Sequence, residues 1–301
     1  MFDIQHQSKG LVSHGVSACA GCGMELIMRT VMNVLGEDTI VLIPPGCSAL
    51  FSGFGNESGL KIPGFQGNLE NTAACAAGVR AALNIQGNTH TTVLAFAGDG
   101  GTVDIGLQAL SGVLERRDKI MYICYDNEAY MNTGIQGSSS TPYYASTTTT
   151  PAGKPTARKN LMEIVMAHDI PYAATASIHN LNDFKKKLQK AKETDGPSLI
   201  HIQTPCPTGW RYDPSKSIEL ARAAVQTGCW ILYEYEDGKV TINNKLKDLK
   251  PITDYIGIQG RFKHMTEEQK EELQDYTIKY YHRYIRKLEN MNVDSEETAT
   301  A

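Results

Sequence analysis

The chain has 301 residues, of which 41% are apolar and 21% charged, and its formal net charge is -4. This composition is typical of a soluble globular protein and unlike that of a disordered or membrane chain. The charge gives no basic face, which argues against nucleic acid as a partner, and no apolar run is long enough to cross a membrane.

The N-terminus MFDIQHQSKG lacks the basic flank and apolar core of a secretory signal, so we expect the protein in the cytoplasm. Cytosolic thiols stay reduced unless they bind metal or do chemistry. The seven cysteines therefore do not suggest a disulfide framework.

Apolar residues follow two alternating patterns, helical spacing and short continuous runs, separated by Gly, Pro and Asn. Such alternation predicts an α/β fold with a mostly parallel sheet and helices on both faces, in which ligands bind at the carboxyl ends of strands. In chain order the sequence predicts a helix over 24–35, a strand over 39–43, a loop over 51–68, a helix over 71–83, a strand over 91–97, a helix over 103–114, a strand over 119–125, an irregular segment over 138–158, a helix over 160–170, a strand over 172–178, a helix over 181–194 and a strand over 198–203.

The remaining features concern loops and the C-terminal part. An irregular segment as long as 138–158 inside a compact domain is usually functional, so we expect a lid or a partner contact there. The Asp237-Gly238 pair predicts a β-hairpin, and Thr266 with Gln269 caps a last helix. We expect one domain over residues 1–290 and a disordered acidic tail over 291–301.

The turn Gly98-Asp99-Gly100-Gly101 lies between a predicted strand and a predicted helix. This layout is typical of a phosphate-binding turn, although a plain turn has the same pattern. Asp99 favours a metal, because a carboxylate facing a diphosphate is repelled unless a divalent cation stands between them. Magnesium prefers oxygen ligands, and the end of the next strand supplies Asn127 and the backbone carbonyl of Ala129.

A dinucleotide-binding fold is the competing interpretation of this turn. It would use Gly98 and Gly100 as the first glycines and Asp126 to bind a ribose. The third glycine is missing because Val103 occupies its place, and Asp99 would face the pyrophosphate without a cation. Titration with NAD(P)H distinguishes the two interpretations.

Four cysteines lie where they could meet at one edge of the sheet. Cys19 and Cys22 form a close pair, and Cys47 and Cys206 each follow a strand. Four thiolates suit an iron–sulfur cluster or zinc, and the sequence leaves both open. A thioredoxin-like pair would have to follow a strand, which the N-terminal segment lacks. The other three cysteines are predicted to be small buried apolar residues: Cys75, Cys124 and Cys229.

Taken together, CAGCG, PPGC, the Gly-Asp-Gly-Gly turn, DNEAYMNTGIQ and PCPTGW resemble the β subunit of pyruvate:ferredoxin oxidoreductases over nearly the whole chain. The resemblance implies the diphosphate-binding (PP-type) fold of thiamine diphosphate enzymes over residues 1–290. It also implies reversible oxidative decarboxylation of a 2-oxoacid such as pyruvate, acyl transfer to coenzyme A and electron transfer to ferredoxin. The implied partners are an α subunit carrying the pyrimidine site, a γ subunit and a δ subunit.

The resemblance also implies the roles of individual residues. A [4Fe-4S] cluster is expected on the four cysteines, Cys19, Cys22, Cys47 and Cys206. Magnesium is expected on Asp99, Asn127 and the Ala129 carbonyl, and Asn132 is expected to face the substrate. The residues expected to contact thiamine diphosphate are Cys47, Gly98, Asp99, Gly100, Gly101, Asn127, Glu128, Ala129, Tyr130, Met131 and Asn132.

Three other functions remain open. A branched-chain enzyme acting on 2-oxoisovalerate is the nearest, because side-chain selectivity in such complexes lies mostly in the partner subunit. A non-redox thiamine decarboxylase or synthase would keep the magnesium site without needing the four cysteines. A zinc-stapled scaffold protein would bind no thiamine.

Overall fold

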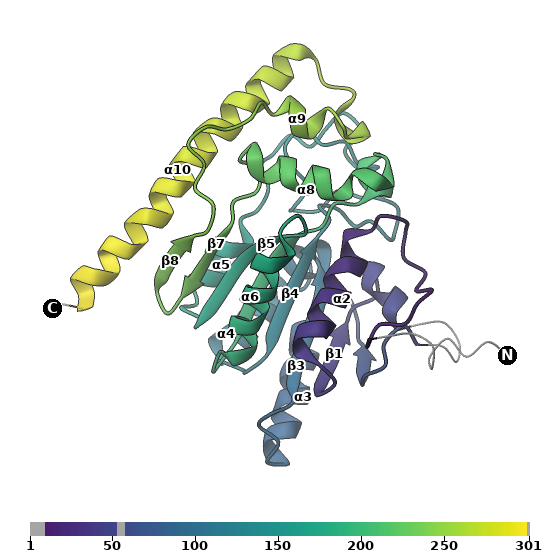
Figure 1. Cartoon of the computed structure of the whole chain (residues 1–301), viewed down its shortest axis with the longest axis vertical. Coiled ribbons are helices and arrows are strands. Elements are labelled where there is room, and N and C mark those ends of the chain that lie inside the picture. The colour runs from purple at the N-terminus through teal and green to yellow at the C-terminus, as the bar shows by residue number, and fades with distance from the viewer. Residues whose placement is uncertain (1–9, 53–57, 300–301) are drawn as a thin grey trace.

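One eight-stranded sheet forms the centre of the molecule, in the order β2-β1-β3-β4-β6-β5-β7-β8 (Figure 1). The computed structural model describes residues 10–52 and 58–299, with side chains as far as residue 292. The first six strands of this order, β2, β1, β3, β4, β6 and β5, are parallel to their neighbours. Strand β7 pairs antiparallel with both β5 and β8. The strands are β1 (Thr39–Ile43), β2 (Gly64–Gln66), β3 (Thr92–Gly98), β4 (Met121–Asp126), β5 (Tyr172–Ser177), β6 (Ser198–Gln203), β7 (Tyr233–Glu236) and β8 (Lys239–Ile242).

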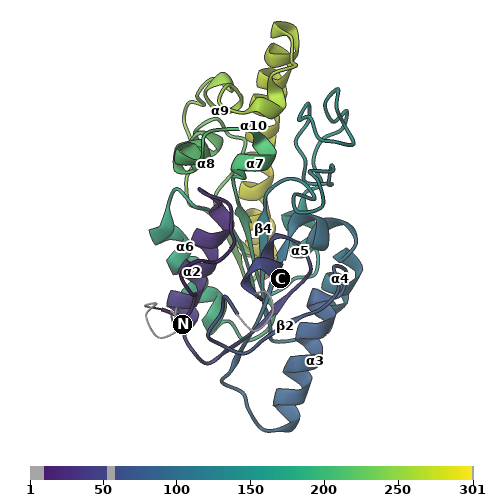
Figure 2. The same cartoon turned by 90° about the vertical axis from the view of Figure 1, so that its right-hand side faces the viewer.

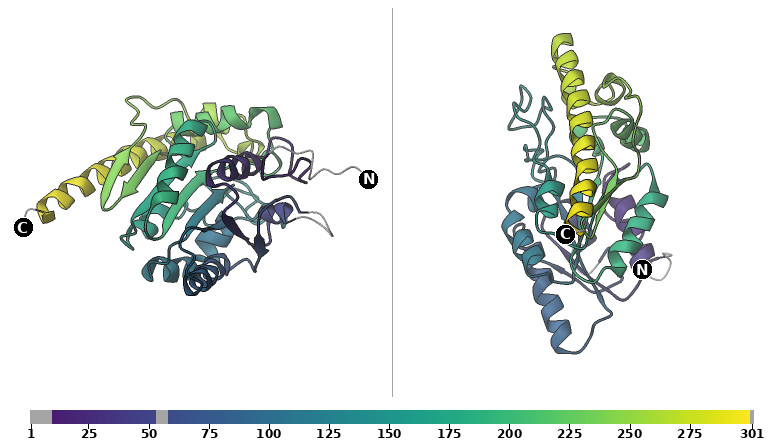
Figure 3. Two further views of the ribbon diagram at one scale, coloured as in Figure 1. Left: turned by 60° about the horizontal axis from the view of Figure 1, so that its bottom comes forward. Right: turned by 90° about the vertical axis from the view of Figure 1, so that its left-hand side faces the viewer.

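Helices cover both faces of this sheet. They are α2 (Gly23–Leu35), η1 (Cys47–Phe51), α3 (Thr72–Ile85), η2 (Gly100–Asp104), α4 (Leu107–Glu115), α5 (Leu161–Met166), α6 (Leu181–Glu193), α7 (Pro207–Trp210), η3 (Pro214–Lys216), α8 (Ser217–Gln226), α9 (Thr253–Ile256), η4 (Gly260–Phe262) and α10 (Glu267–Ala299). Figure 2 shows α2 and α6 on one face and α3, α4 and α5 on the other. Helix α10 extends along β8 and away from the body (Figure 3).

The central strands are apolar on both sides because helices bury both sides. In β3, Leu94 and Phe96 face the core shared with α2 and α6, whereas Val93 and Ala95 face the core shared with α3 and α4. Each fully buried Leu, Val or Phe contributes about 1.5–3 kcal/mol relative to an exposed one. The ends of these strands are therefore held rigidly, which suits them to position a site. The predicted α/β fold is confirmed.

Local signals in the sequence are also confirmed. The Thr266 hydroxyl accepts from the Gln269 amide at 3.2 Å, and the Gln269 side chain accepts from the Thr266 amide at 3.0 Å. Asp237 and Gly238 have φ of 47° and 85°, as expected of the turn that joins the twisted strands β7 and β8.

Some segments differ from the sequence prediction. The predicted loop over 51–68 contains the edge strand β2, whose three exposed residues carry no apolar pattern. The helix predicted from Val103 begins as a π-helical turn, η2, and becomes regular at Leu107. Helix α10 continues to Ala299, where we expected a disordered tail from residue 291, because no Gly or Pro interrupts it.

Residues 1–9, in which we looked for a secretory signal, and residues 53–57 of the predicted loop lie outside the described residues. Among the described helices, none is both long and apolar enough to cross a membrane.

Residues 138–158 are irregular, as predicted, but are tied together by hydrogen bonds. Tyr144 donates to the Lys154 carbonyl at 2.9 Å, and Lys154 donates to the Ala145 carbonyl at 3.0 Å. The segment stands out from the body beyond the sheet (Figure 2). Its role as a lid or a partner contact stays a prediction.

Candidate functional site

A pocket opens where β1, β3 and β4 end, at the carboxyl edge of the sheet. Parallel sheets commonly bind ligands in this place, because short loops from adjacent strands meet there. All but one of the residues expected to contact thiamine diphosphate line this pocket: Cys47, Gly98, Asp99, Gly100, Gly101, Asn127, Ala129, Tyr130, Met131 and Asn132. Asn132 lies exposed on its rim.

Three polar groups converge on one point of the pocket. One end of the Asn127 amide lies 3.0 Å from Asp99 Oδ1 and 2.8 Å from the Ala129 carbonyl oxygen. With its nitrogen at that end, the amide donates to both oxygens, and this orientation satisfies the hydrogen bonds of the chain without a cation. With its oxygen at that end, three oxygens would face a bound cation, and the nitrogen would lie 4.0 Å from Cys47 Sγ. We call Asp99, Asn127 and the Ala129 carbonyl the oxygen cluster.

The spacing of the oxygen cluster fits an octahedral cation. Magnesium binds oxygen at about 2.0–2.1 Å with ligands at right angles, so neighbouring ligand oxygens lie about 3 Å apart. The two distances to this end of the Asn127 amide have this value. Without a cation between them three oxygens would repel one another, and turning the amide over would relieve the repulsion.

Asp99 is a buried carboxylate, only 1% exposed, and accepts a 2.6 Å hydrogen bond from the Ser138 hydroxyl. Burial, and then the nearby Asp126 carboxylate, raises the pKa of Asp99 well above its ordinary value. A group with so little solvation favours a bound proton or a bound cation. The donor set of this chain therefore fits a divalent metal.

Two glycines allow neighbouring residues to pack directly against the turn. A Cβ on Gly100 would lie 2.4 Å from the Tyr130 ring, and a Cβ on Gly101 would lie 3.2 Å from the Leu69 carbonyl oxygen. A side chain at Gly100 would therefore displace Tyr130, which lines the pocket.

The structure brings the four predicted cysteine ligands to the same edge. Cys22 precedes α2, Cys47 opens η1, and Cys206 caps α7, where its sulfur accepts from the Gly209 amide at 3.3 Å. Burial and then the thiols of Cys206, Cys22 and Cys19 raise the pKa of Cys47 to about 12. We call these four residues the cysteine cluster.

The cysteine cluster is open. Burial raises the pKa of Cys206 to about 11, whereas Cys19 is exposed. In the described part of the chain, no three His, Cys, Asp or Glu side chains lie close enough to bind one metal ion. A tetrahedral zinc site would place its thiolates about 4 Å apart, since zinc–sulfur bonds are about 2.3 Å long. Of the three cysteines predicted to be buried, Cys124 is fully buried in β4, whereas Cys75 and Cys229 are partly exposed, so the prediction is wrong for those two.

Glu128 is the expected contact residue that does not line the pocket. Its carboxylate forms ion pairs with Arg261 at 2.6 Å and Arg158 at 3.1 Å. Its neighbour Asp126 accepts from Arg158 at 2.6 Å and from His201 at 2.7 Å. The sequence did not reveal this network, because its members lie far apart along the chain.

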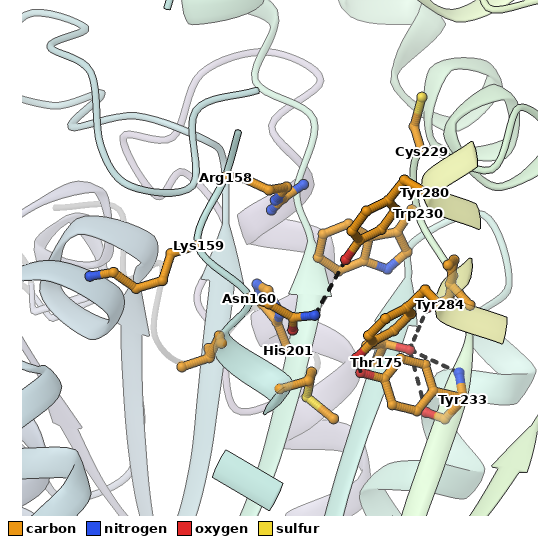
Figure 4. Close-up of a pocket in the computed structure, with 13 residues that line it drawn as sticks. Arg158, Lys159, Asn160, Thr175, His201, Cys229, Trp230, Tyr233, Tyr280 and Tyr284 are labelled. Atoms are coloured by element: carbon orange, nitrogen blue, oxygen red, sulfur yellow. Dashed lines mark hydrogen bonds between the residues drawn. The ribbon is translucent and has the colours of Figure 1, made fainter. Parts of the chain in front are cut away.

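A second pocket lies between α10 and the ion-pair network of Glu128 and Asp126; Arg158 and His201 line it on the network side, and Tyr280 and Tyr284 on the α10 side. Figure 4 shows Arg158 beside Trp230, whose ring centroid lies 5.0 Å from the guanidinium carbon. Lys159 points away from the pocket, and the Asn160 amide donates to the Tyr280 hydroxyl. The Arg158 charge is already paired with Asp126 and Glu128, so this arginine is not free to bind an anionic ligand in the pocket.

Trp210 holds the loop of the oxygen cluster from α7. Its indole N–H donates to the Asn127 carbonyl at 2.8 Å, and the Arg261 guanidinium lies 3.9 Å from its ring centroid. In the sequence, Trp210 is the last residue of the motif PCPTGW, and no local pattern predicts its contact with Asn127.

Comparison with known proteins agrees with this geometry. The sequence profile "Thiamine pyrophosphate enzyme, C-terminal TPP binding domain" matches residues 44–202. A pyruvate synthase subunit PorB from Methanothermobacter thermautotrophicus is 51% identical over 267 residues, which are 87% of this chain and 93% of that protein. A ketoisovalerate oxidoreductase subunit VorB from Pyrococcus abyssi is 49% identical over 286 residues, 91% of this chain and 92% of that protein.

A solved 2-oxoglutarate:ferredoxin oxidoreductase from Magnetococcus marinus shares the fold, with a TM-score of 0.58 and 21% identity over 70% of this chain and 79% of that chain. The resemblance read from the motifs is thereby confirmed by relatives that align over most of the chain. The protein belongs to the family of thiamine diphosphate-binding β subunits of 2-oxoacid:ferredoxin oxidoreductases.

Proposed function

We propose that this chain is the β subunit of a pyruvate:ferredoxin oxidoreductase and binds thiamine diphosphate, Mg2+ and one [4Fe-4S] cluster. The observation that carries the proposal is the position of the oxygen cluster beside the cysteine cluster, with Asn127 and Cys47 in contact. The proposed partners are α, γ and δ subunits, ferredoxin and coenzyme A.

The oxygen cluster supports the magnesium part of the proposal. Asp99, the Asn127 amide oxygen and the Ala129 carbonyl would hold the cation, and diphosphate oxygens and water would complete its shell. Bound cation would also fix the Asn127 amide with its nitrogen toward Cys47.

The cysteine cluster supports the iron–sulfur part. Three of its members, Cys19, Cys22 and Cys206, lie outside residues 44–202, so a thiamine-binding domain alone does not require them. Zinc has no redox chemistry, whereas an iron–sulfur cluster can accept electrons, as the relatives named oxidoreductases require, so we propose iron–sulfur here.

Bound thiamine diphosphate would supply the electron sink for decarboxylation of the 2-oxoacid. The chain itself contributes placement. Asp99 and Asn127 orient the diphosphate end, Cys47 lines both the pocket and the cysteine cluster, and Asn132 faces the opening where a substrate enters. Asp99 is the one carboxylate among the described residues that line the pocket, and the family resemblance assigns the group that contacts the aminopyrimidine to the α subunit.

We propose pyruvate as the preferred substrate and 2-oxoisovalerate as the second candidate. The second has specific support, because the VorB relative is 49% identical and the PorB relative 51%. Turnover of the complex with each acid, coenzyme A and ferredoxin ranks them. Equal rates would contradict a preference for pyruvate.

The proposal is tested on the native complex purified without oxygen. We expect thiamine, magnesium, iron and sulfide in the wild type, and Cys47→Ser should lower the iron and sulfide content. Cys124→Ala is the matched control, because this cysteine is buried in β4 among apolar residues. Equal losses in the two variants, or zinc in place of iron, would contradict the assignment.

A further inference from the structure

Helix α7 touches both clusters. It begins at Cys206, whose sulfur accepts from the Gly209 amide. It ends at Trp210, whose indole N–H donates to the Asn127 carbonyl at 2.8 Å. A Cβ on Gly209 would lie 2.1 Å from the Met131 sulfur, so the loop of the oxygen cluster also packs directly on the helix.

The C-terminal end of α7 also makes close contacts, with the residues of η4. Arg211, which follows the helix, has a left-handed backbone with φ of 57° and accepts from the Gly260 amide at 3.0 Å. A Cβ on Gly260 would lie 2.7 Å from the Arg211 Cβ. Arg261 then stacks on the Trp210 ring while its guanidinium pairs with Glu128, in the same loop as Asn127. Helix α7 therefore cannot shift without moving that loop.

We propose that Trp210 is a positioning residue that couples the oxygen cluster to the cysteine cluster. Its hydrogen bond fixes the backbone carbonyl of Asn127, and so the position from which the Asn127 side chain extends toward Asp99. Through α7, the position of Cys206 then affects how well the oxygen cluster binds magnesium and diphosphate. Coupling of two binding equilibria is reciprocal, so a bound diphosphate must also affect the cysteine cluster. This inference rests on the proposed function.

The chain offers a matched pair of tryptophans for the test. Trp230 is also buried, its N–H donates to the Ala176 carbonyl at the same 2.8 Å, and Arg158 lies over its ring. Trp210→Phe and Trp230→Phe thus each remove one buried N–H while keeping an aromatic ring under an arginine. Only the first removes a contact to the oxygen cluster.

Both variants are made in the complete complex and purified without oxygen. We expect Trp210→Phe to weaken thiamine diphosphate binding at fixed Mg2+ by about tenfold, as for other residues that orient metal ligands, and Trp230→Phe to leave it unchanged. The electron paramagnetic resonance spectrum of the reduced cluster should change when thiamine diphosphate is removed from the wild type. In Trp210→Phe this change should be smaller.

The outcomes separate this inference from the proposed function. A wild type without thiamine and iron would overturn both. A wild type with both cofactors and Trp210→Phe with unaltered affinity, or equal weakening in the two variants, would overturn the coupling alone. Should Trp210→Phe not fold, Arg261→Lys keeps a cation beside Glu128 but loses the flat group on the indole. It should weaken binding about threefold, and unchanged binding would contradict the coupling.

Discussion

The two clusters at the carboxyl edge of the sheet are built in different ways. The oxygen cluster comes from the ends of adjacent strands β3 and β4 and is braced by buried ion pairs at Glu128. The cysteine cluster comes from three distant parts of the chain, and Cys19 is exposed. The fold therefore preforms the first cluster, whereas the second would be drawn together by the proposed iron–sulfur cluster.

The largest difference between the clusters should appear when a ligand is removed. Cys47→Ser should abolish the iron–sulfur cluster and electron transfer to ferredoxin, since no other residue is proposed to replace Cys47 as a ligand. Cys124→Ala should cost only about 1–2 kcal/mol of unfolding free energy through lost packing. Iron analysis and thermal unfolding of the two variants check this. A Cys47→Ser complex that retains full iron would contradict it.

Asp99→Asn tests the preformed cluster. The carboxylate supplies the charge that a cation between it and a diphosphate would balance, so we expect thiamine diphosphate affinity to fall by about 100-fold. The iron content should stay at the wild-type level, because Asp99 holds no iron in this account. Equilibrium dialysis and iron assay measure both quantities, and a loss of iron as large as the loss of thiamine would contradict the assignment of Asp99 to the oxygen cluster alone.

Glu128→Gln tests the bracing. It leaves Arg261, which is buried and pairs with Glu128 at 2.6 Å, without its full countercharge. Breaking a buried ion pair in this way costs about 3–5 kcal/mol. Thermal unfolding of the complex should show this loss, together with weaker thiamine binding. Glu25→Gln is the control, since its 2.7 Å pair with Arg29 is partly exposed, and we expect it to cost less than about 1 kcal/mol.

The pH dependence of iron uptake tests the open cluster. Burial raises the pKa of Cys47 to about 12 and that of Cys206 to about 11, from an ordinary value of 9.0. Both are therefore protonated thiols at pH 7, and each must lose a proton to bind iron. Reconstitution of the iron-free chain should become more favourable as the pH rises from 7 to 9. Uptake that falls over this range would contradict the assignment.

The smallest effect is expected from Tyr125→Phe. The Tyr125 hydroxyl accepts from the Ser48 amide at 3.1 Å, next to Cys47, across the gap between β4 and η1. Loss of one buried hydrogen bond costs about 1 kcal/mol, so iron retention on mild chelation should fall only slightly. A complete loss of iron would mean that Cys47 is held by the fold rather than by its ligand.

The strands and most of the residues of the two clusters could be predicted from the sequence, because apolar runs, turns and short motifs are local features. Apolar runs marked the strands, and strand ends predicted that Asp99, Asn127 and Ala129 would meet. Glu128 was placed among the thiamine contacts by resemblance, but the structure pairs its carboxylate with Arg261, 133 residues away. No periodicity or motif reports an ion pair over such a separation. The contact between Trp210 and the Asn127 carbonyl escaped prediction for the same reason.

One carboxylate, one amide and one carbonyl are proposed to hold a cation and diphosphate next to an iron–sulfur cluster. Anomalous X-ray scattering at the iron and zinc edges, from crystals of the oxygen-free complex, would locate each metal. We expect an iron signal centred among Cys19, Cys22, Cys47 and Cys206, with thiamine diphosphate density at Asp99. A zinc signal among these cysteines, or density for neither cofactor, would overturn the proposed function.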